Sequence, residues 1–116
     1  MGSKLGATHK EKLLESETIN STTYSSIVDI DGAEHGYAVQ VIWVNGVGVN
    51  MTLSIETSLN GTDWSEIPST VGSITAAGDN VMYDIANTYV QYARVKILVT
   101  AGTADFTVLY SGKRRH

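Results

Sequence analysis

The alternation of apolar and polar residues, rich in β-branched and aromatic side chains, constrains the fold of this chain most strongly. It runs from Thr18 to Tyr110, and no stretch after residue 17 has the 3.6-residue period of an amphipathic helix. Alternate side chains of a strand point to the same face of a sheet, so the pattern predicts strands with one buried face. The intervening Thr52, Ser54 and Glu56 are expected to face water. The expected inward positions are Met51, Leu53 and Ile55, and one face of the preceding strand is expected to hold Tyr37, Val39, Val41 and Trp43.

Turn signals divide this pattern into short strands. Asn45-Gly46 and Asn60-Gly61 each predict a tight hairpin, because such dipeptides readily adopt positive φ angles. Ala101-Gly102-Thr103 is expected to join two further strands, and Pro68, the only proline, marks a strand end or a sheet edge. Strands are expected within residues 18–30, 37–44, 51–56, 71–75, 81–85, 89–100 and 105–110, with one more beside the second hairpin. About eight strands predict an antiparallel β-sandwich that is jelly-roll-like.

Length and composition set the class of protein. A chain of 116 residues is expected to form one domain around one core. It contains no cysteine, so neither a disulfide nor a thiolate metal site is available. No apolar run approaches the ~20 residues that a membrane helix requires, and the N-terminal segment lacks the apolar stretch of a secretory signal. We therefore expect no membrane partner. The pI of about 5.2 argues against a nucleic-acid partner as well.

Positive charge is concentrated at the two ends of the chain. Residues 16–112 hold two cations against ten carboxylates, 2 − 10 = −8, whereas residues 113–116 alone carry three cations. We expect an extended N-terminal arm over residues 1–16, with one helical turn between Lys10 and Glu15, a β-sandwich domain over 17–112 and a basic tail over 113–116. Basic ends can simply be solvated, or they can dock on acidic neighbours. The docking hypothesis predicts partner-binding residues at Lys4, Leu5, Lys10, Lys12, Leu13, Leu14, Lys113, Arg114 and Arg115.

The sequence offers few groups for catalysis or metal binding. Asp29, Asp31 and Glu34 lie near His35 and could ligate a hard cation, but the later carboxylates of a calcium loop are missing. A solvated acidic turn is the favoured interpretation. The glycine-rich segment 45–49 lacks the Lys-Ser/Thr pair and the following helix of a phosphate-binding loop. We predict no catalytic residues, no metal site, no cofactor and no enzymatic activity.

Aromatic residues support an alternative function. Trp43, Trp64 and six tyrosines could form a platform on which a sugar ring stacks. An inward position explains Trp43 equally well, and packing of the hairpin explains Trp64. Trp64 is the candidate ligand platform if the protein is a carbohydrate-binding or adhesion module.

Two segments resemble a known group of proteins. They are the hairpin 58–67, with the pattern S-x-N-G-x-x-W, and the later strand 89–97, with Y-x-R-V-x-I. Together they resemble small β-sandwich accessory proteins of tailed bacteriophage virions, and less closely the discoidin-type carbohydrate-binding modules. Those modules are usually longer and have a disulfide that closes their ends.

The phage resemblance implies a structural protein of the virion that is assembled in the host cytoplasm. It would be a capsid decoration or cement protein, or a head-tail or tail component. Its expected partners are the major capsid protein, other virion subunits and further copies of itself, in a homo-oligomer.

Overall fold

The computed structural model of the protein describes residues 8–30, 36–86 and 90–113. The regular elements in this part of the chain are β-strands and one short 3-10 helix, η1. None of the described residues belongs to a helix that is long and apolar enough to span a membrane. The elements are β1 (Thr8–Ile19), β2 (Thr23–Tyr24), β3 (Val28–Asp29), β4 (Tyr37–Ser58), β5 (Ser65–Glu66), η1 (Pro68–Thr70), β6 (Gly72–Ile74), β7 (Asp79–Ile85) and β8 (Tyr92–Lys113).

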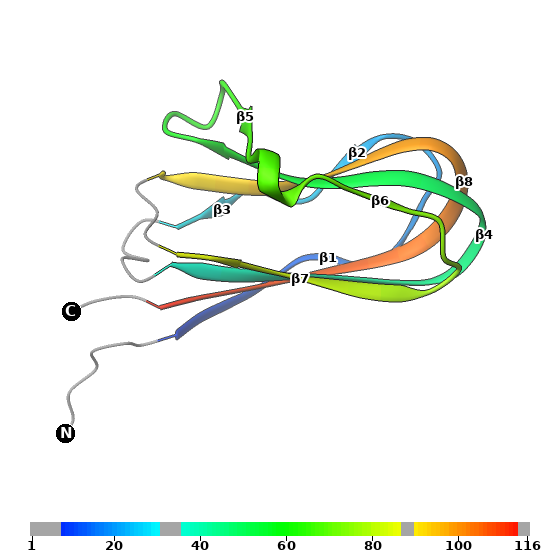
Figure 1. Ribbon diagram of the computed structural model, residues 1–116. Helices are drawn as coiled ribbons and strands as arrows, with labels where there is room; N and C mark the ends of the chain where they lie inside the picture. The colour runs from blue at the N-terminus through cyan, green and yellow to red at the C-terminus, as the bar shows by residue number, and fades with distance from the viewer. Residues whose placement is uncertain (1–7, 31–35, 87–89, 114–116) are drawn as a thin grey trace.

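The strands form one antiparallel sheet that bends over on itself (Figure 1). The two long strands β4 and β8 pair from Tyr37↔Gly112 to Ser58↔Tyr92, and both curve through the bend. The lower layer in Figure 1 contains β1, β7, the first half of β4 and the second half of β8. The upper layer contains β2, β3, β5, β6 and the other halves of β4 and β8. The predicted antiparallel β-sandwich of about eight strands is confirmed.

The predicted hairpin at Asn45-Gly46 is wrong, because both residues lie inside β4. Asn45 does have a positive φ, 57°, but the backbone uses it for a bulged corner rather than a tight turn. The pairing register between β4 and β8 shifts between Val44 and Met51. Segments 37–44 and 51–56 therefore lie in different layers, and each pairs with β8 instead of with the other.

The predicted connection at Ala101-Gly102-Thr103 is also part of a strand. Gly102, with φ of 88°, lies where β8 bends opposite the bend of β4, so the strands expected at 89–100 and 105–110 are halves of β8. The second hairpin is confirmed, since β4 and β5 pair on either side of Asn60-Gly61. Pro68 follows the end of β5 and begins η1, as its strand-end role predicts.

The core lies between the two layers. The expected inward side chains Met51, Leu53 and Ile55 are buried, and the face of β4 shared by Tyr37, Val39, Val41 and Trp43 is buried too. Trp43 stacks on Phe106 with ring centroids 6.0 Å apart. The indole N–H of Trp43 donates to the Ala76 carbonyl at 3.0 Å, which satisfies its polar atom. The expected water-facing positions are corrected in part, because Ser54 and Glu56 are buried.

The prediction of an N-terminal arm is corrected from Thr8 onward. Residues 8–16 belong to β1, which pairs with β8 from Thr8↔Lys113 to Ile19↔Ala104, so the helical turn expected between Lys10 and Glu15 is a strand. Pairing supplies backbone hydrogen bonds and buries Leu13 and Ile19, each with 2% of its surface exposed. Residues 1–7 lie outside the described part of the chain.

Tyr37 makes stability sensitive to alkaline pH. Its side chain is 3% exposed, and its hydroxyl has no hydrogen-bond partner among the described residues. Burial raises the pKa of Tyr37 from 10.0 to about 12, and the neighbouring Tyr110 adds to the rise. Between these two pH values the unfolded chain loses the proton while the folded protein keeps it. Stability is therefore expected to fall as the pH rises from about 10 toward 12.

The substitution Tyr37→Phe is expected to remove most of this pH dependence, on the order of 2 kcal/mol near pH 12. Near pH 7 it is expected to leave stability unchanged or slightly higher, because it removes an unpaired buried hydroxyl. Urea unfolding of both proteins at neutral and alkaline pH measures the difference. An equally steep alkaline loss in Tyr37→Phe would show that another group causes it.

Candidate interaction surface

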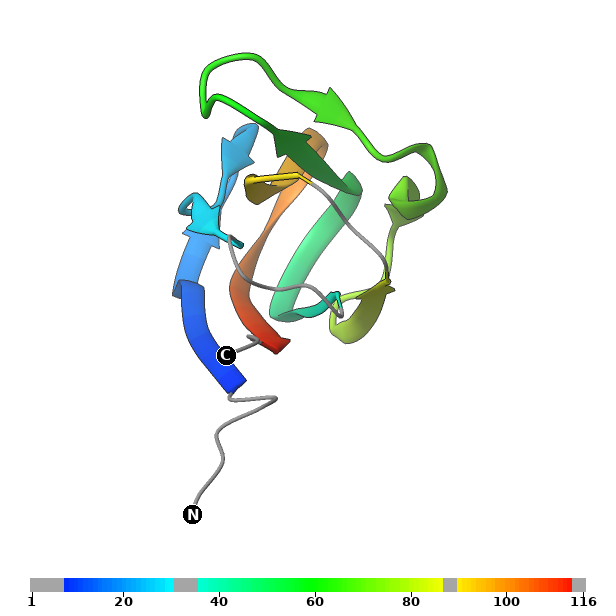
Figure 2. The same ribbon diagram turned by 90° about the vertical axis from the view of Figure 1, so that its left-hand side faces the viewer.

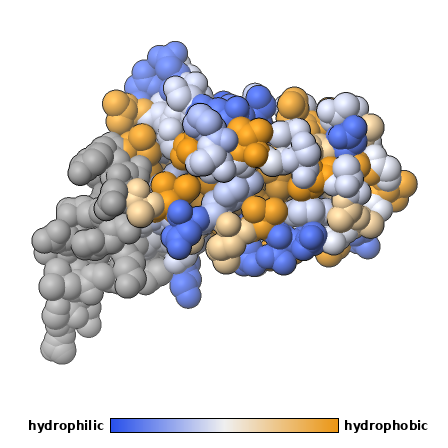
Figure 3. Space-filling view, viewed as in Figure 1, coloured by the Kyte–Doolittle hydropathy of each residue, from blue (hydrophilic) through white to orange (hydrophobic). Residues whose placement is uncertain are grey.

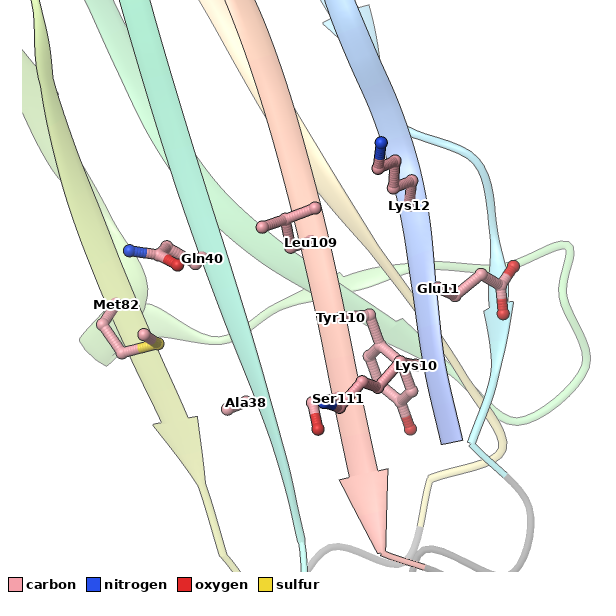
Figure 4. A pocket seen from close by; sticks show the side chains of 9 residues that line it. All are labelled: Lys10, Glu11, Lys12, Ala38, Gln40, Met82, Leu109, Tyr110 and Ser111. Carbon is pink, nitrogen blue, oxygen red and sulfur yellow. The ribbon is translucent and has the colours of Figure 1, made fainter. Parts of the chain in front are cut away.

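A groove crosses the outer face of the lower layer and has a volume of about 450 Å³ (Figure 4). It is built from strands that are distant in sequence but adjacent in the sheet, in the order β1, β8, β4 and β7. The face seen in Figure 3 has apolar and hydrophilic residues interspersed, with no single continuous apolar patch. The residues lining the groove are Lys10, Glu11, Lys12, Ala38, Gln40, Met82, Leu109, Tyr110 and Ser111.

Strand alternation and register place these side chains together. Lys12 lies opposite Leu109 on β8, Leu109 lies opposite Gln40 on β4, and Gln40 lies opposite Met82 on β7. Their neighbours along the strands, among them Val41 and Val108, point into the core. The groove residues at alternate positions therefore face outward.

The groove combines an apolar floor with a cationic rim. Ala38 and Leu109 are half-buried on the floor, whereas Met82 is 58% exposed. Lys12 contacts Glu15 at 3.3 Å, with side chains 57% and 69% exposed. Such an exposed ion pair contributes little, so the ammonium group can exchange this carboxylate for another. The arrangement suits a partner with an apolar side chain and a carboxylate.

Only part of the predicted partner-binding set lies on this surface. Lys10 and Lys12 are exposed at the rim. Leu13 is a core residue with 2% exposure, and Leu14 packs partly buried against the core, so neither covers exposed surface as expected. The bulge between Lys12 and Leu14 turns both leucines toward the interior.

Of the C-terminal residues in the predicted partner-binding set, the structure describes only Lys113. Lys113 pairs with Thr8 at the end of β8. The remaining residues, Lys4, Leu5, Arg114 and Arg115, lie outside the described part of the chain.

A second cluster, on the outer face of the upper layer, was not predicted. The Arg94 guanidinium lies between the rings of Tyr24 and Trp64, 4.0 Å and 4.2 Å from their centroids. Its Nε donates to Glu56 Oε1 at 2.8 Å, and the two side chains are only 19% and 12% exposed. The cluster explains why Glu56 is buried on a face that was expected to be wet. Sequence alternation placed Glu56 outward but could not show that Arg94 lies opposite it on β8.

The same cluster limits the alternative role of Trp64. Arg94 covers one face of the indole, so that face is not available to a sugar ring. The loop before Trp64 is held by Asn60, whose Oδ1 accepts hydrogen bonds from the backbone N–H groups of Thr62 and Asp63 at 2.8 and 2.9 Å. Trp64 thus packs against its own sheet through a rigid hairpin.

The described residues contain no group of three or more His, Cys, Asp or Glu side chains that could hold a metal ion. Of the acidic turn considered above, Asp29 accepts a hydrogen bond from Gln91 Nε2 at 2.6 Å. Asp31, Glu34 and His35 lie outside the described residues.

Comparisons with known proteins identify the fold. No protein-family model matches the chain, and no curated protein matches its sequence. Among solved structures, the SPBc2 prophage-derived protein YomS matches with a TM-score of 0.60 and 10% identity, over 96% of this chain and 100% of YomS. The PBSX exported protein XepA matches with a TM-score of 0.62 and 21% identity, over 93% of this chain but only 37% of XepA.

The chain has the fold of these two phage-derived proteins. The resemblance to phage β-sandwich proteins is thereby confirmed at the level of the fold.

Proposed function

We propose that this protein is a non-enzymatic structural subunit of a phage virion that decorates or cements the capsid shell. Its partners are the major capsid protein, other virion subunits or further copies of itself. The observation that carries the proposal is the fold shared with the whole of YomS and with part of XepA. The hairpin at Asn60-Gly61 and the strand segment around Arg94, on which the resemblance to phage proteins rests, both belong to this fold.

The groove on the lower layer gives this role a physical basis. A cement protein must join neighbouring subunits through contacts that are individually weak and repeated over the lattice. Lys10 and Lys12 at the rim can pair with carboxylates of a neighbour, and the floor around Leu109 can bury an apolar side chain. The rigid two-layer core holds this surface in place.

Carbohydrate binding is not the function that the geometry favours. Trp64, its candidate platform, has one face against Arg94 and is half-buried. A subunit at the head-tail junction would use the same surface to join its neighbours. The position of the protein in purified particles distinguishes this role from one on the capsid shell.

Purified particles of the phage that encodes this chain test the proposal. We expect the chain to be present in a fixed ratio to the major capsid protein by quantitative mass spectrometry. Cryo-electron microscopy is expected to place it over the capsid lattice. Density at the neck or tail instead would overturn the decoration role but keep the structural one. A chain found in the lysate and absent from washed particles would overturn both.

A further inference from the structure

The two edges of the lower layer carry side chains of opposite charge. Figure 2 shows β1, β2 and β3 along one side of the molecule and β5, β6 and β7 along the other. Within the described residues, β1 pairs with β8 alone and β7 with β4 alone, so each ends the lower layer. A sheet edge exposes backbone N–H and C=O groups that can accept a further strand.

On the outer face, the β1 edge is cationic. Lys10 lies opposite Ser111 and Lys12 opposite Leu109, so both lysines are on the outer face beside the groove. Glu11 also borders the groove, but it lies opposite the core-facing Tyr110, and Figure 4 shows its side chain directed away from those of Lys12 and Leu109. After this stretch, the Leu13 carbonyl accepts a hydrogen bond from the Ser26 N–H at 3.1 Å, so strand addition is confined to the residues before Leu13. Two lysines two residues apart thus stand along the outer face of this edge, and Lys12 also contacts the exposed Glu15 at 3.3 Å, a contact that an added carboxylate would replace.

The β7 edge has the opposite character. Its outward positions are Asn80, Met82 and Asp84, which lie opposite Ile42, Gln40 and Ala38. Asp84 is thus the outward carboxylate of β7, whereas Asp79 lies opposite the core-facing Trp43, and β7 contains no cation. An acidic strand would be repelled at β7 and attracted at β1, because like charges on adjacent strands destabilise a pair and opposite charges stabilise it.

We propose that β1 is the acceptor edge for an extended, acidic segment of a neighbouring virion subunit. The segment adds as a strand beside residues 8–12 and places carboxylates at alternate positions, next to Lys10 and Lys12. Backbone hydrogen bonds supply affinity in this mode of recognition, and the alternate side chains supply specificity. The inference rests on the proposed function, since it names the kind of partner that the lower layer binds.

Short synthetic peptides test the proposal on the full-length protein. The probe is a peptide in which glutamate alternates with valine, and the matched control has lysine in place of glutamate. We expect the acidic peptide to bind by fluorescence anisotropy and to slow amide hydrogen exchange within residues 8–12. The double substitution Lys10→Glu/Lys12→Glu is expected to weaken binding at least about tenfold, whereas Lys96→Glu, in the upper layer, leaves it unchanged.

Each other outcome overturns the proposal in a distinct way. Equal binding of both peptides shows that charge does not select the occupant. Binding without slower exchange in β1 places the peptide elsewhere, such as in the groove. No binding of either peptide shows that the lysines only protect the edge. If the protein self-associates and Lys10→Glu/Lys12→Glu abolishes this self-association, the occupant of the β1 edge is a second copy of the chain, bound through its acidic β7.

Incorporation into particles separates this inference from the proposed function. If the charge-reversed variant joins phage particles as well as the wild-type protein does, the acceptor role of β1 fails. The virion role would still stand. If neither protein is found in particles, the virion role fails, whatever the peptides show.

Discussion

Replacing Arg94 by alanine is expected to lower the free energy of unfolding by about 3 kcal/mol. The substitution leaves the Glu56 carboxylate, only 12% exposed, without its 2.8 Å partner. Breaking a buried ion pair on one side is strongly destabilising, because the remaining charge has lost both water and its counter-ion. It also removes the cation from between Tyr24 and Trp64, which stack on it at 4.0 and 4.2 Å.

Urea unfolding, followed by tryptophan fluorescence and by circular dichroism, measures this effect. The double substitution Arg94→Ala/Glu56→Ala is expected to cost less than the sum of its two single substitutions, because it leaves no buried carboxylate unpaired. Lys96→Ala, on the next outward position of β8, serves as the control and should change stability by less than about 0.5 kcal/mol. A loss for Arg94→Ala as small as that of the control would show that the cluster does not stabilise the fold.

Replacing Gly102 by alanine is expected to cost at least about 3 kcal/mol, because two penalties coincide at the bend of β8. Its φ of 88° is a conformation that residues with a Cβ atom rarely adopt. An added Cβ would also meet the backbone oxygens of Gly48 and Val47, in the facing bend of β4. Backbone atoms cannot move aside as a flexible side chain can, so β4 and β8 would separate where the sheet turns over.

Two other glycines provide matched controls for Gly102. Gly48 has a φ of 59° but open space around an added Cβ, so Gly48→Ala should show the conformational penalty alone, about 1 kcal/mol. Gly72 has neither a positive φ nor a nearby atom, so Gly72→Ala should be nearly neutral. Thermal unfolding of the three variants is expected to rank them in this order. Equal losses at Gly48 and Gly102 would remove the steric argument.

The interaction surface was predictable only in part. The segregation of cations to the chain ends pointed to Lys10 and Lys12, and both lie at the groove rim. It also pointed to Leu13, which is buried because β1 is a sheet strand and not an arm. The Arg94 cluster was missed, since Tyr24 and Trp64 lie 70 and 30 residues away along the chain (94 − 24 and 94 − 64) and meet it only in the folded sheet.

By itself, the sequence determined that the alternating apolar side chains between residues 37 and 55 belong to strands and share a face. A shared face follows from local alternation, so Met51, Leu53 and Ile55 could be assigned to the core from their neighbours alone. Only the tertiary structure decided whether a positive φ closes a hairpin or bends a strand. The backbone at Asn45 is compatible with both, and its choice depends on pairing with β8, which is 60 residues away at Asp105. The Asn45 side-chain amide donates a 2.9 Å hydrogen bond to the Asp105 carboxylate across this pairing. That long-range pairing turns the expected separate strands into a sheet that folds over on itself.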